Sequence, residues 1–404
     1  MAGGSLTIGP ARASSGTGRL ILLGAITALG SLAIQIIVPA LPQLAQGIDA
    51  SAAGGQLVIS VYLVALALGQ LVWAPIADFH GRRPVLLAGI VIFLIGTLVC
   101  AVAGDLATML LGRAIQSVGA SSSLVTGRAM ATDTAPAGKA AAPLAILTSV
   151  TLISPALAPA VGGAITSIGG WRALFWILAA LTLIGGMLAP RMLPETRPGD
   201  RVPQNPRRLI GTYWRVARHG GYLPLAASNA LISGGFYTFL AASPFVLEAA
   251  GATPALAGLF YSGVACAIIG GTLCVPVILR RWPTRLKTGG SLALGTGGLA
   301  VLAVAATGAN LVGLFVSMAL IAFGAGLTGP ALLAEAIERQ RERASVATSL
   351  FGTMQMGGAA LISTAAVRLA PGPQLELALI GVLVWLALAL RAWAGNAAGA
   401  GPTA

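Results

Sequence analysis

Apolar stretches of about 20 residues recur along the whole chain, and the polar connections between them are short with one exception. A helix of about 20 apolar residues spans the hydrocarbon core of a bilayer. A helix is the expected form, because open sheets leave backbone groups unpaired in lipid and the alternating pattern of barrel strands is absent. The pattern predicts an all-α integral membrane protein with twelve transmembrane helices, at 20–41, 54–76, 84–103, 106–128, 140–167, 172–190, 220–242, 254–279, 288–307, 309–333, 345–369 and 374–393.

The one long connection lies near the middle of the chain. Residues 191–219 contain seven arginines and four prolines and no apolar run. This basic linker divides the chain into an N-terminal bundle of six helices, 20–190, and a C-terminal bundle of six helices, 220–393. Tails at 1–19 and 394–404 complete the predicted organisation. A plan of six plus six helices is typical of transporters built from two repeats around a central pathway.

The composition excludes other classes of protein. Of 404 residues, 56% are apolar and only 9% are charged, so the chain cannot cover the surface of a soluble domain. The net charge of +13 does not indicate nucleic-acid binding, because the charges are few and form short clusters between apolar runs. The 54 glycines suit helices that pack closely in lipid.

The positions of the basic residues predict the orientation. Of the 24 Lys and Arg, only Arg172 and Arg368 fall on the outer side when the N-terminus is placed inside. Arg113 lies within a span, which leaves 21 on the inner side. Because positive charges remain on the cytoplasmic side, both termini are predicted to be cytoplasmic.

Few residues could support catalysis or bind a metal. All eleven acidic residues fall in loops or at predicted helix ends, and the two histidines, His80 and His219, lie in polar connections. A membrane-embedded enzyme needs clustered titratable groups at membrane depth. We therefore expect neither an enzyme nor a cofactor nor a metal site, and nothing in the pattern favours a receptor or scaffold.

A polar motif joins the second and third predicted helices. It reads Gly-Gln-Leu-Val-Trp-Ala-Pro-Ile-Ala-Asp-Phe-His-Gly-Arg-Arg-Pro over residues 69–84. Gly81 and Pro84 favour a tight turn, and Asp78 could accept hydrogen bonds at a helix N-terminus. A simpler interpretation is a positively charged inner turn with an incidental acid.

This motif resembles the loop motif of the major facilitator superfamily, and most closely that of its Bcr/CflA drug-resistance subfamily. Two positions depart from the pattern, because Ala74 replaces a glycine and Phe79 replaces an arginine. The resemblance implies that Asp78, Gly81, Arg82 and Arg83 form an inner gate. It also implies location in a bacterial cytoplasmic (inner) membrane.

Arg113 lies inside the fourth predicted helix, in the sequence Arg-Ala-Ile-Gln-Ser. The pattern is similar to the superfamily's Arg-x-x-Gln-Gly. Arg113 shares one helix face with Ser117 and Ser121, and an arginine inside a span costs about 2.5–3.5 kcal/mol on insertion scales. It must therefore face protein, water or a ligand. A functional role is favoured over a structural one, because intramembrane charges usually mark pathways.

The fifth predicted helix carries two prolines, Pro155 and Pro159, followed by the pair Gly162 and Gly163. Prolines bend a helix and glycines permit close packing, so a bent packing helix is the simplest interpretation. The run also resembles the antiporter motif Gly-x-x-x-Gly-Pro-x-x-Gly-Gly, with Ser154 and Ala158 in place of the leading glycines. This resemblance implies export.

Gln35 occupies a position in the first helix where the resembled subfamily usually carries an aspartate. An aspartate there could exchange a proton with substrate, whereas a glutamine can only form hydrogen bonds. Proton coupling directly at this position is therefore not expected.

The sequence predicts a secondary transporter that exports small amphipathic, drug-like molecules by alternating access, with proton coupling but without a midspan carboxylate. Uptake or facilitated transport of a small metabolite is the alternative, and the missing acid favours it. The expected partners are a small-molecule substrate, membrane lipid and protons, with no nucleic acid, and a monomer is expected. The residues predicted to line the substrate site are Gln35, Arg113, Gln116, Asn229 and Tyr237.

Overall fold

The computed structural model describes residues 11–134, 141–196, 206–218, 221–281, 283–307, 310–340, 344–369 and 372–399. Several basic residues that entered the orientation argument lie outside these ranges: Lys139, Arg197, Arg201, Arg341 and Arg343. His219 and parts of both predicted tails also lie outside them. Within the described ranges every regular element of secondary structure is a helix, and turns and short irregular segments connect them.

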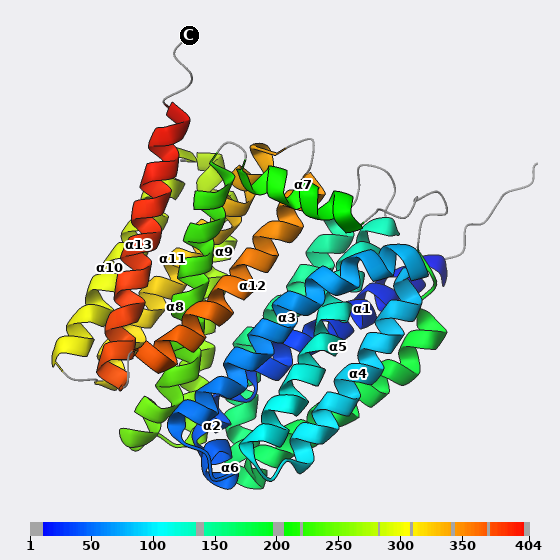
Figure 1. Ribbon diagram of the computed structural model, residues 1–404, viewed down its shortest axis with the longest axis horizontal. Coiled ribbons are helices and arrows are strands. Elements are labelled where there is room, and N and C mark those ends of the chain that lie inside the picture. The colour runs from blue at the N-terminus through cyan, green and yellow to red at the C-terminus, as the bar shows by residue number, and fades with distance from the viewer. Residues whose placement is uncertain are drawn as a thin grey trace, which may run out of the picture.

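The helices form two bundles that lie side by side (Figure 1). The N-terminal bundle contains α1 (Ala11–Gln35), η1 (Val38–Ala40), α2 (Leu41–Gly47), α3 (Ala52–His80), α4 (Arg82–Val102), α5 (Leu106–Asp133) and α6 (Ala141–Met192). The C-terminal bundle contains α8 (Tyr222–Ala249), α9 (Pro254–Arg281), α10 (Pro283–Thr307), α11 (Leu311–Glu338), α12 (Ala344–Leu369) and α13 (Pro373–Gly399).

Two features of the helices refine the predicted spans. α6 is continuous over 52 residues except at Gly170, whose φ of 71° turns the chain back, so α6 supplies two spans. The first predicted span is interrupted, because α1 ends at Gln35 and a short 3-10 turn around Pro39 precedes α2. The architecture is therefore twelve transmembrane helices in two bundles of six, as predicted.

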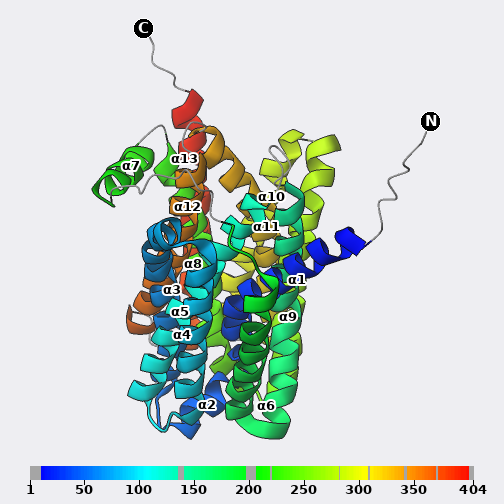
Figure 2. The same ribbon diagram turned by 90° about the vertical axis from the view of Figure 1, so that its right-hand side faces the viewer.

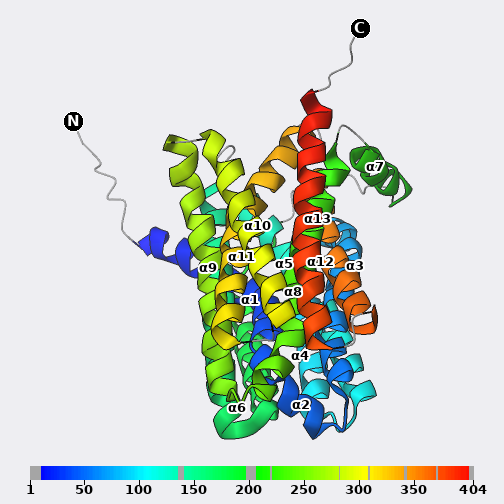
Figure 3. The ribbon, with the colours of Figure 1, turned by 90° about the vertical axis from the view of Figure 1, so that its left-hand side faces the viewer.

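Part of the predicted linker is helical. Residues Pro206–Arg218 form α7, which packs against α8 and α12. α7 lies at the same end of the molecule as the last turns of α13 (Figures 1 and 2). The opposite end holds α2 and the bend of α6 (Figures 2 and 3). We call these the linker end and the bend end.

Local signals fix several helix boundaries. The side chains of Ser51, Asp105 and Asn310 accept hydrogen bonds from the third backbone N–H that follows and so cap α3, α5 and α11. Thr108 donates two hydrogen bonds to the Asp105 carboxylate and holds the pKa of that group below its usual value. Gly81, with a φ of 103°, ends α3 and lets α4 begin at the next residue.

Nine stretches of the described chain are long and apolar enough to cross a membrane by length and composition. α5 and α12 are not among them, because both carry polar side chains into the bundles. The buried polar side chains of α5 are Arg113, Gln116, Ser117, Ser121, Ser122, Ser123 and Thr126. Large apolar side chains face outward on many other helices, among them Leu68, Val91, Leu259 and Leu361, as expected of surfaces in contact with lipid.

Candidate functional site

Arg113 is fully buried at the centre of a polar cluster in the N-terminal bundle. Its guanidinium donates to the backbone oxygens of Ala33 on α1 (3.1 Å) and Val58 on α3 (3.3 Å), and to Oε1 of Gln116 (2.7 Å). The Ala33 oxygen lies in the last turn of α1, where helical N–H partners run out. All three acceptors are neutral, as the scarcity of acids at membrane depth predicted.

One nitrogen of the Arg113 guanidinium remains unused. Nη2 is buried and has no hydrogen-bond partner in the described part of the protein. Unpaired buried donors are rare in folded proteins, and one on a charged group is costlier still. The geometry therefore leaves Nη2, with its two charge-assisted N–H donors, without a protein acceptor in the described chain.

Tyr62 of α3 extends the cluster toward the second bundle. The Arg113 guanidinium carbon lies 4.1 Å from the centroid of the Tyr62 ring, in a cation–π contact. The Tyr62 hydroxyl donates to the backbone oxygen of Gly30 (3.0 Å), and Tyr237 of α8 is near enough to interact with it electrostatically. No sequence pattern indicated Tyr62, because it lies within an apolar run.

Gln116 is engaged at both ends of its amide. Its oxygen accepts from Arg113, and its nitrogen donates to Oγ1 of Thr97 on α4 (2.9 Å). A side chain with both polar atoms satisfied holds its neighbours in place and has little left for a ligand. The geometry therefore fits Gln116 as a positioning residue for Arg113, although the sequence suggested a lining role.

The polar side chains of α8 have different partners. Ser233 accepts a hydrogen bond from Gln355 of α12 (3.0 Å). Asn229, 4% exposed, has an Nδ2 without a partner in the described chain. Asn229 and Tyr237 are eight residues apart, about 12 Å along the helix. Of Asn229, Ser233 and Tyr237, it is Tyr237 that interacts electrostatically with Tyr62 of the Arg113 cluster.

Gln35 is the last residue of α1 and is 7% exposed. It lies two residues beyond Ala33, whose backbone oxygen accepts from Arg113. Gln35 thus directly follows the helical turn whose backbone accepts from Arg113, at the point where α1 ends.

The two bundles are joined by hydrogen bonds in the half of the helices nearest the bend end. Gln46 bonds Glu248 (2.9 Å), Gln56 bonds Glu376 (3.1 Å), and the hydroxyls of Ser60 and Ser363 lie 3.4 Å apart. Glu376 occupies the first turn of α13, as the sequence predicted for an acid at a helix end, yet it is only 6% exposed. The structure is closed at the bend end.

The prolines and glycines of α6 form a close contact between the bundles. A Cβ atom on Gly163 would clash with the backbone oxygen of Pro254 on α9, and one on Gly258 of α9 would clash with that of Pro159. The backbone N–H of Ala160 donates to Oγ of Ser262 across the same contact (3.1 Å). Gly162 packs in the same way against the backbone oxygen of Ile36. These residues therefore let α6 touch its neighbours backbone to backbone.

The motif at residues 69–84 forms a charged network, here called the inner network, at the linker end of the N-terminal bundle. Arg82 is buried between Asp78 (2.6 Å) and Asp133 of α5 (3.4 Å). Glu195 accepts hydrogen bonds from the backbone N–H groups of Arg82 (2.9 Å) and Arg83 (3.1 Å) at the start of α4. The sequence suggested Asp78 for this place at a helix N-terminus, but Asp78 lies in the last turn of α3. The roles of Asp133 and Glu195 were not foreseen.

Glu195→Gln should lower the thermal stability of the N-terminal bundle. The amide would keep one acceptor oxygen but lose the negative charge at the positive end of the α4 dipole. We expect a loss of about 1 kcal/mol, the usual cost of a lost cap. Thermal unfolding of the purified protein measures it, with Asp49→Asn, which changes an exposed carboxylate at the opposite end of the molecule, as the control. Equal losses in both variants would contradict the capping role.

Known membrane transporters are similar to this chain in sequence. The sequence is 30% identical over 258 residues to the MFS-type transporter YdgK of Bacillus subtilis, covering 63% of this chain and 64% of that protein. It is 33% identical over 223 residues to the multidrug resistance protein MdtL of Salmonella typhimurium, covering 55% of this chain and 56% of that protein. Each alignment spans less than two thirds of the relative's length.

Solved structures share the whole architecture at low sequence identity. A crystal structure of the peptide transporter POT matches with a TM-score of 0.78 at 15% identity, over 95% of both chains. The xylose transporter XylE from E. coli, in a partially occluded inward open conformation, matches with a TM-score of 0.72 at 16% identity, over 94% of this chain and 97% of that one. The sequence model of the Major Facilitator Superfamily matches residues 23–363, and the chain belongs to that family of membrane transporters.

Proposed function

We propose that this protein exports small amphipathic molecules from the cytoplasm by alternating access. The unpartnered Nη2 of the buried Arg113 is the observation that carries the proposal, because it offers a fixed positive charge to a ligand. Tyr62 and Tyr237 add aromatic surface beside it, one from each bundle. Export is supported by the relatives that are named multidrug resistance proteins.

The charge of the site sets the expected substrate class. In the described part of the chain no carboxylate is among the partners of Arg113, and position 35 holds a neutral glutamine. A cationic site attracts anionic and electron-rich groups and repels cations. Neutral, zwitterionic and anionic amphiphiles are therefore the proposed substrates, and lipophilic cations are disfavoured.

The orientation belongs to the same proposal. With the linker end in the cytoplasm, both termini face inward and the closed bend end faces outward. A transporter closed at its outer end is in the state that loads substrate from the cytoplasm. Proton coupling uses a group other than residue 35, because glutamine does not titrate.

Uptake or facilitated transport of a metabolite is the second candidate, and Gln35 is the observation that favours it. A midspan acid is the simplest way to couple substrate movement to a proton, and this chain lacks one at that position. The direction and energy dependence of transport distinguish the two candidates.

Energised inside-out vesicles from a host without its own drug pumps test the proposal. We expect them to accumulate a zwitterionic fluorescent amphiphile more than ethidium, and to lose that accumulation when an ionophore collapses the proton gradient. Protease cleavage of a tag at the C-terminus checks the orientation of protein in the vesicles. Accumulation that is independent of energy, or that occurs only in right-side-out vesicles, would favour the second candidate.

A further inference from the structure

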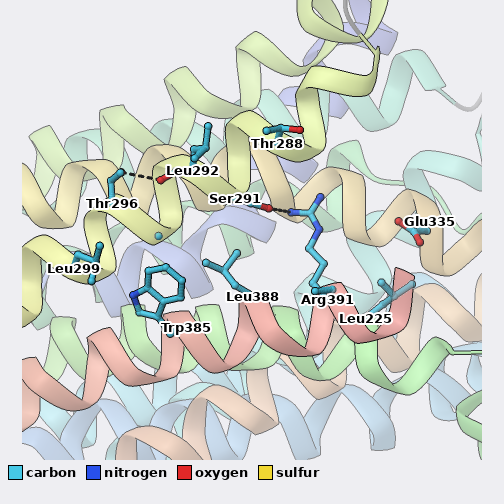
Figure 4. Close-up of a pocket in the computed structure, with 12 residues that line it drawn as sticks. Leu225, Thr288, Ser291, Leu292, Thr296, Leu299, Glu335, Trp385, Leu388 and Arg391 are labelled. Carbon is cyan, nitrogen blue, oxygen red and sulfur yellow. Dashed lines mark hydrogen bonds between the residues drawn. The ribbon is translucent and has the colours of Figure 1, made fainter. Parts of the chain in front are cut away.

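A groove of about 640 Å³ lies in the C-terminal bundle between α10 and α13 (Figure 4), on the side of that bundle away from the N-terminal bundle (Figure 1). Its volume is within the usual range for sites that bind small molecules. Its walls belong to the outer surface of the bundle: Leu292, Leu299 and Trp385 are 62%, 57% and 43% exposed. A ligand would therefore reach the groove from the surrounding lipid.

The groove is polar at its linker end and apolar at the end nearer the middle of the helices. Thr288, Ser291 and Arg391 line the polar end, whereas Leu299 and Trp385 line the apolar end (Figure 4). Thr288 and Leu299 are eleven residues apart on α10, about 16 Å along the helix. This length is close to half of a hydrocarbon core of about 30 Å. The groove thus has the depth of one leaflet and the polarity of an amphiphile that lies in it.

Arg391 gives the polar end a positive charge. Its Nη1 donates to Oγ of Ser291 (3.3 Å), and a guanidinium has further donors to offer. Glu335 also lines the groove and attracts Arg391 electrostatically, but its carboxylate pairs with Arg339 at 2.7 Å. The group of two arginines and one glutamate keeps a net positive charge, so it complements an anionic headgroup.

We propose that this groove binds one anionic phospholipid, with an acyl chain along Leu292, Leu299 and Trp385 and the phosphate at Arg391. The guanidinium fork matches a phosphate in geometry as well as charge. A zwitterionic lipid would fill the same apolar walls but would bring a cation next to Arg391. The proposal does not depend on the direction of transport, because it concerns only the lipid-facing surface.

Lipid binding to the purified full-length protein, followed by native mass spectrometry, tests the proposal. The probes are palmitoyl-oleoyl phosphatidylglycerol and the matching phosphatidylcholine, and the readout is the Kd of the first lipid bound. We expect phosphatidylglycerol to bind more tightly. Arg391→Gln should weaken it about fivefold, the usual effect of one basic residue near an anionic membrane surface, and leave phosphatidylcholine unchanged.

Three further variants make the result specific to the groove. Arg281→Gln removes an exposed arginine at the same end of the molecule but outside the groove, and should change neither Kd. Arg391→Lys should keep most of the preference, and Gly295→Leu, which fills the groove against Trp385, should weaken both lipids. Equal affinity of the parent for the two lipids, or equal weakening of phosphatidylglycerol in Arg391→Gln and Arg281→Gln, would overturn the proposal.

Discussion

Arg113→Lys should leave the protein folded and inserted but lower the transport of zwitterionic and anionic substrates roughly 10- to 150-fold. A lysine ammonium has three donors, enough for the backbone oxygens of Ala33 and Val58 and for Gln116, but none would remain for substrate. The expected loss corresponds to one hydrogen bond to a charged group, about 1.5–3 kcal/mol. Initial transport rates in vesicles at equal protein content measure it.

Arg172→Lys is the matched control. Arg172 also stacks on an aromatic ring, 4.1 Å from the centroid of Trp171, and also donates to a backbone oxygen, that of Ala103 (2.9 Å). It lies at the bend end, away from the Arg113 cluster, so its replacement should not change transport. Equal loss in both variants, or none in Arg113→Lys, would assign Arg113 a structural role.

Arg113→Ala separates stability from substrate binding. It removes the hydrogen-bond donor of the buried oxygens of Ala33 and Gln116, and each unpaired oxygen costs about 1–3 kcal/mol of stability. We therefore expect this variant to lose both thermal stability and transport. The lysine variant should lose transport alone.

Gly258→Ala should open the bend end of the protein. The added Cβ would clash with the backbone oxygen of Pro159, and a backbone group cannot move aside as a flexible side chain can. The clash exists only while α9 is pressed against α6, so it disfavours the closed arrangement. A shift of about 1.4 kcal/mol changes the ratio of closed to open molecules tenfold.

Cysteine accessibility measures this opening. Ser363 is fully buried in the closed contact, so Ser363→Cys should react slowly with a membrane-impermeant maleimide and at least about tenfold faster when combined with Gly258→Ala. The native Cys100, Cys266 and Cys274 are replaced beforehand. Gly270→Ala, on the same helix with open space around it, is the control and should leave the rate unchanged. Equal rates in the two alanine variants would show that the methyl group added by Gly258→Ala does not separate the two bundles.

The inner network illustrates how far local sequence signals reach. The motif containing Asp78, Gly81, Arg82 and Arg83 predicted a tight charged turn, and the structure has one. The partners Asp133 and Glu195 are 51 and 113 residues from Arg82 along the chain. Nothing in the residues next to Arg82 indicates which distant acids will reach it, because that depends on how α5 and α6 pack against α4.

The sequence alone determined the number of spans, the division into two bundles and the family, because each follows from local apolar length or from a contiguous motif. It also identified Arg113, because a charge inside an apolar run is conspicuous wherever the helix packs. Only the tertiary structure decided what surrounds that charge: Tyr62 at its face, Gln116 as a support and one nitrogen without a partner. It also decided that Glu376 is buried against Gln56, 320 residues away, since helix ends become an interface only when two bundles meet.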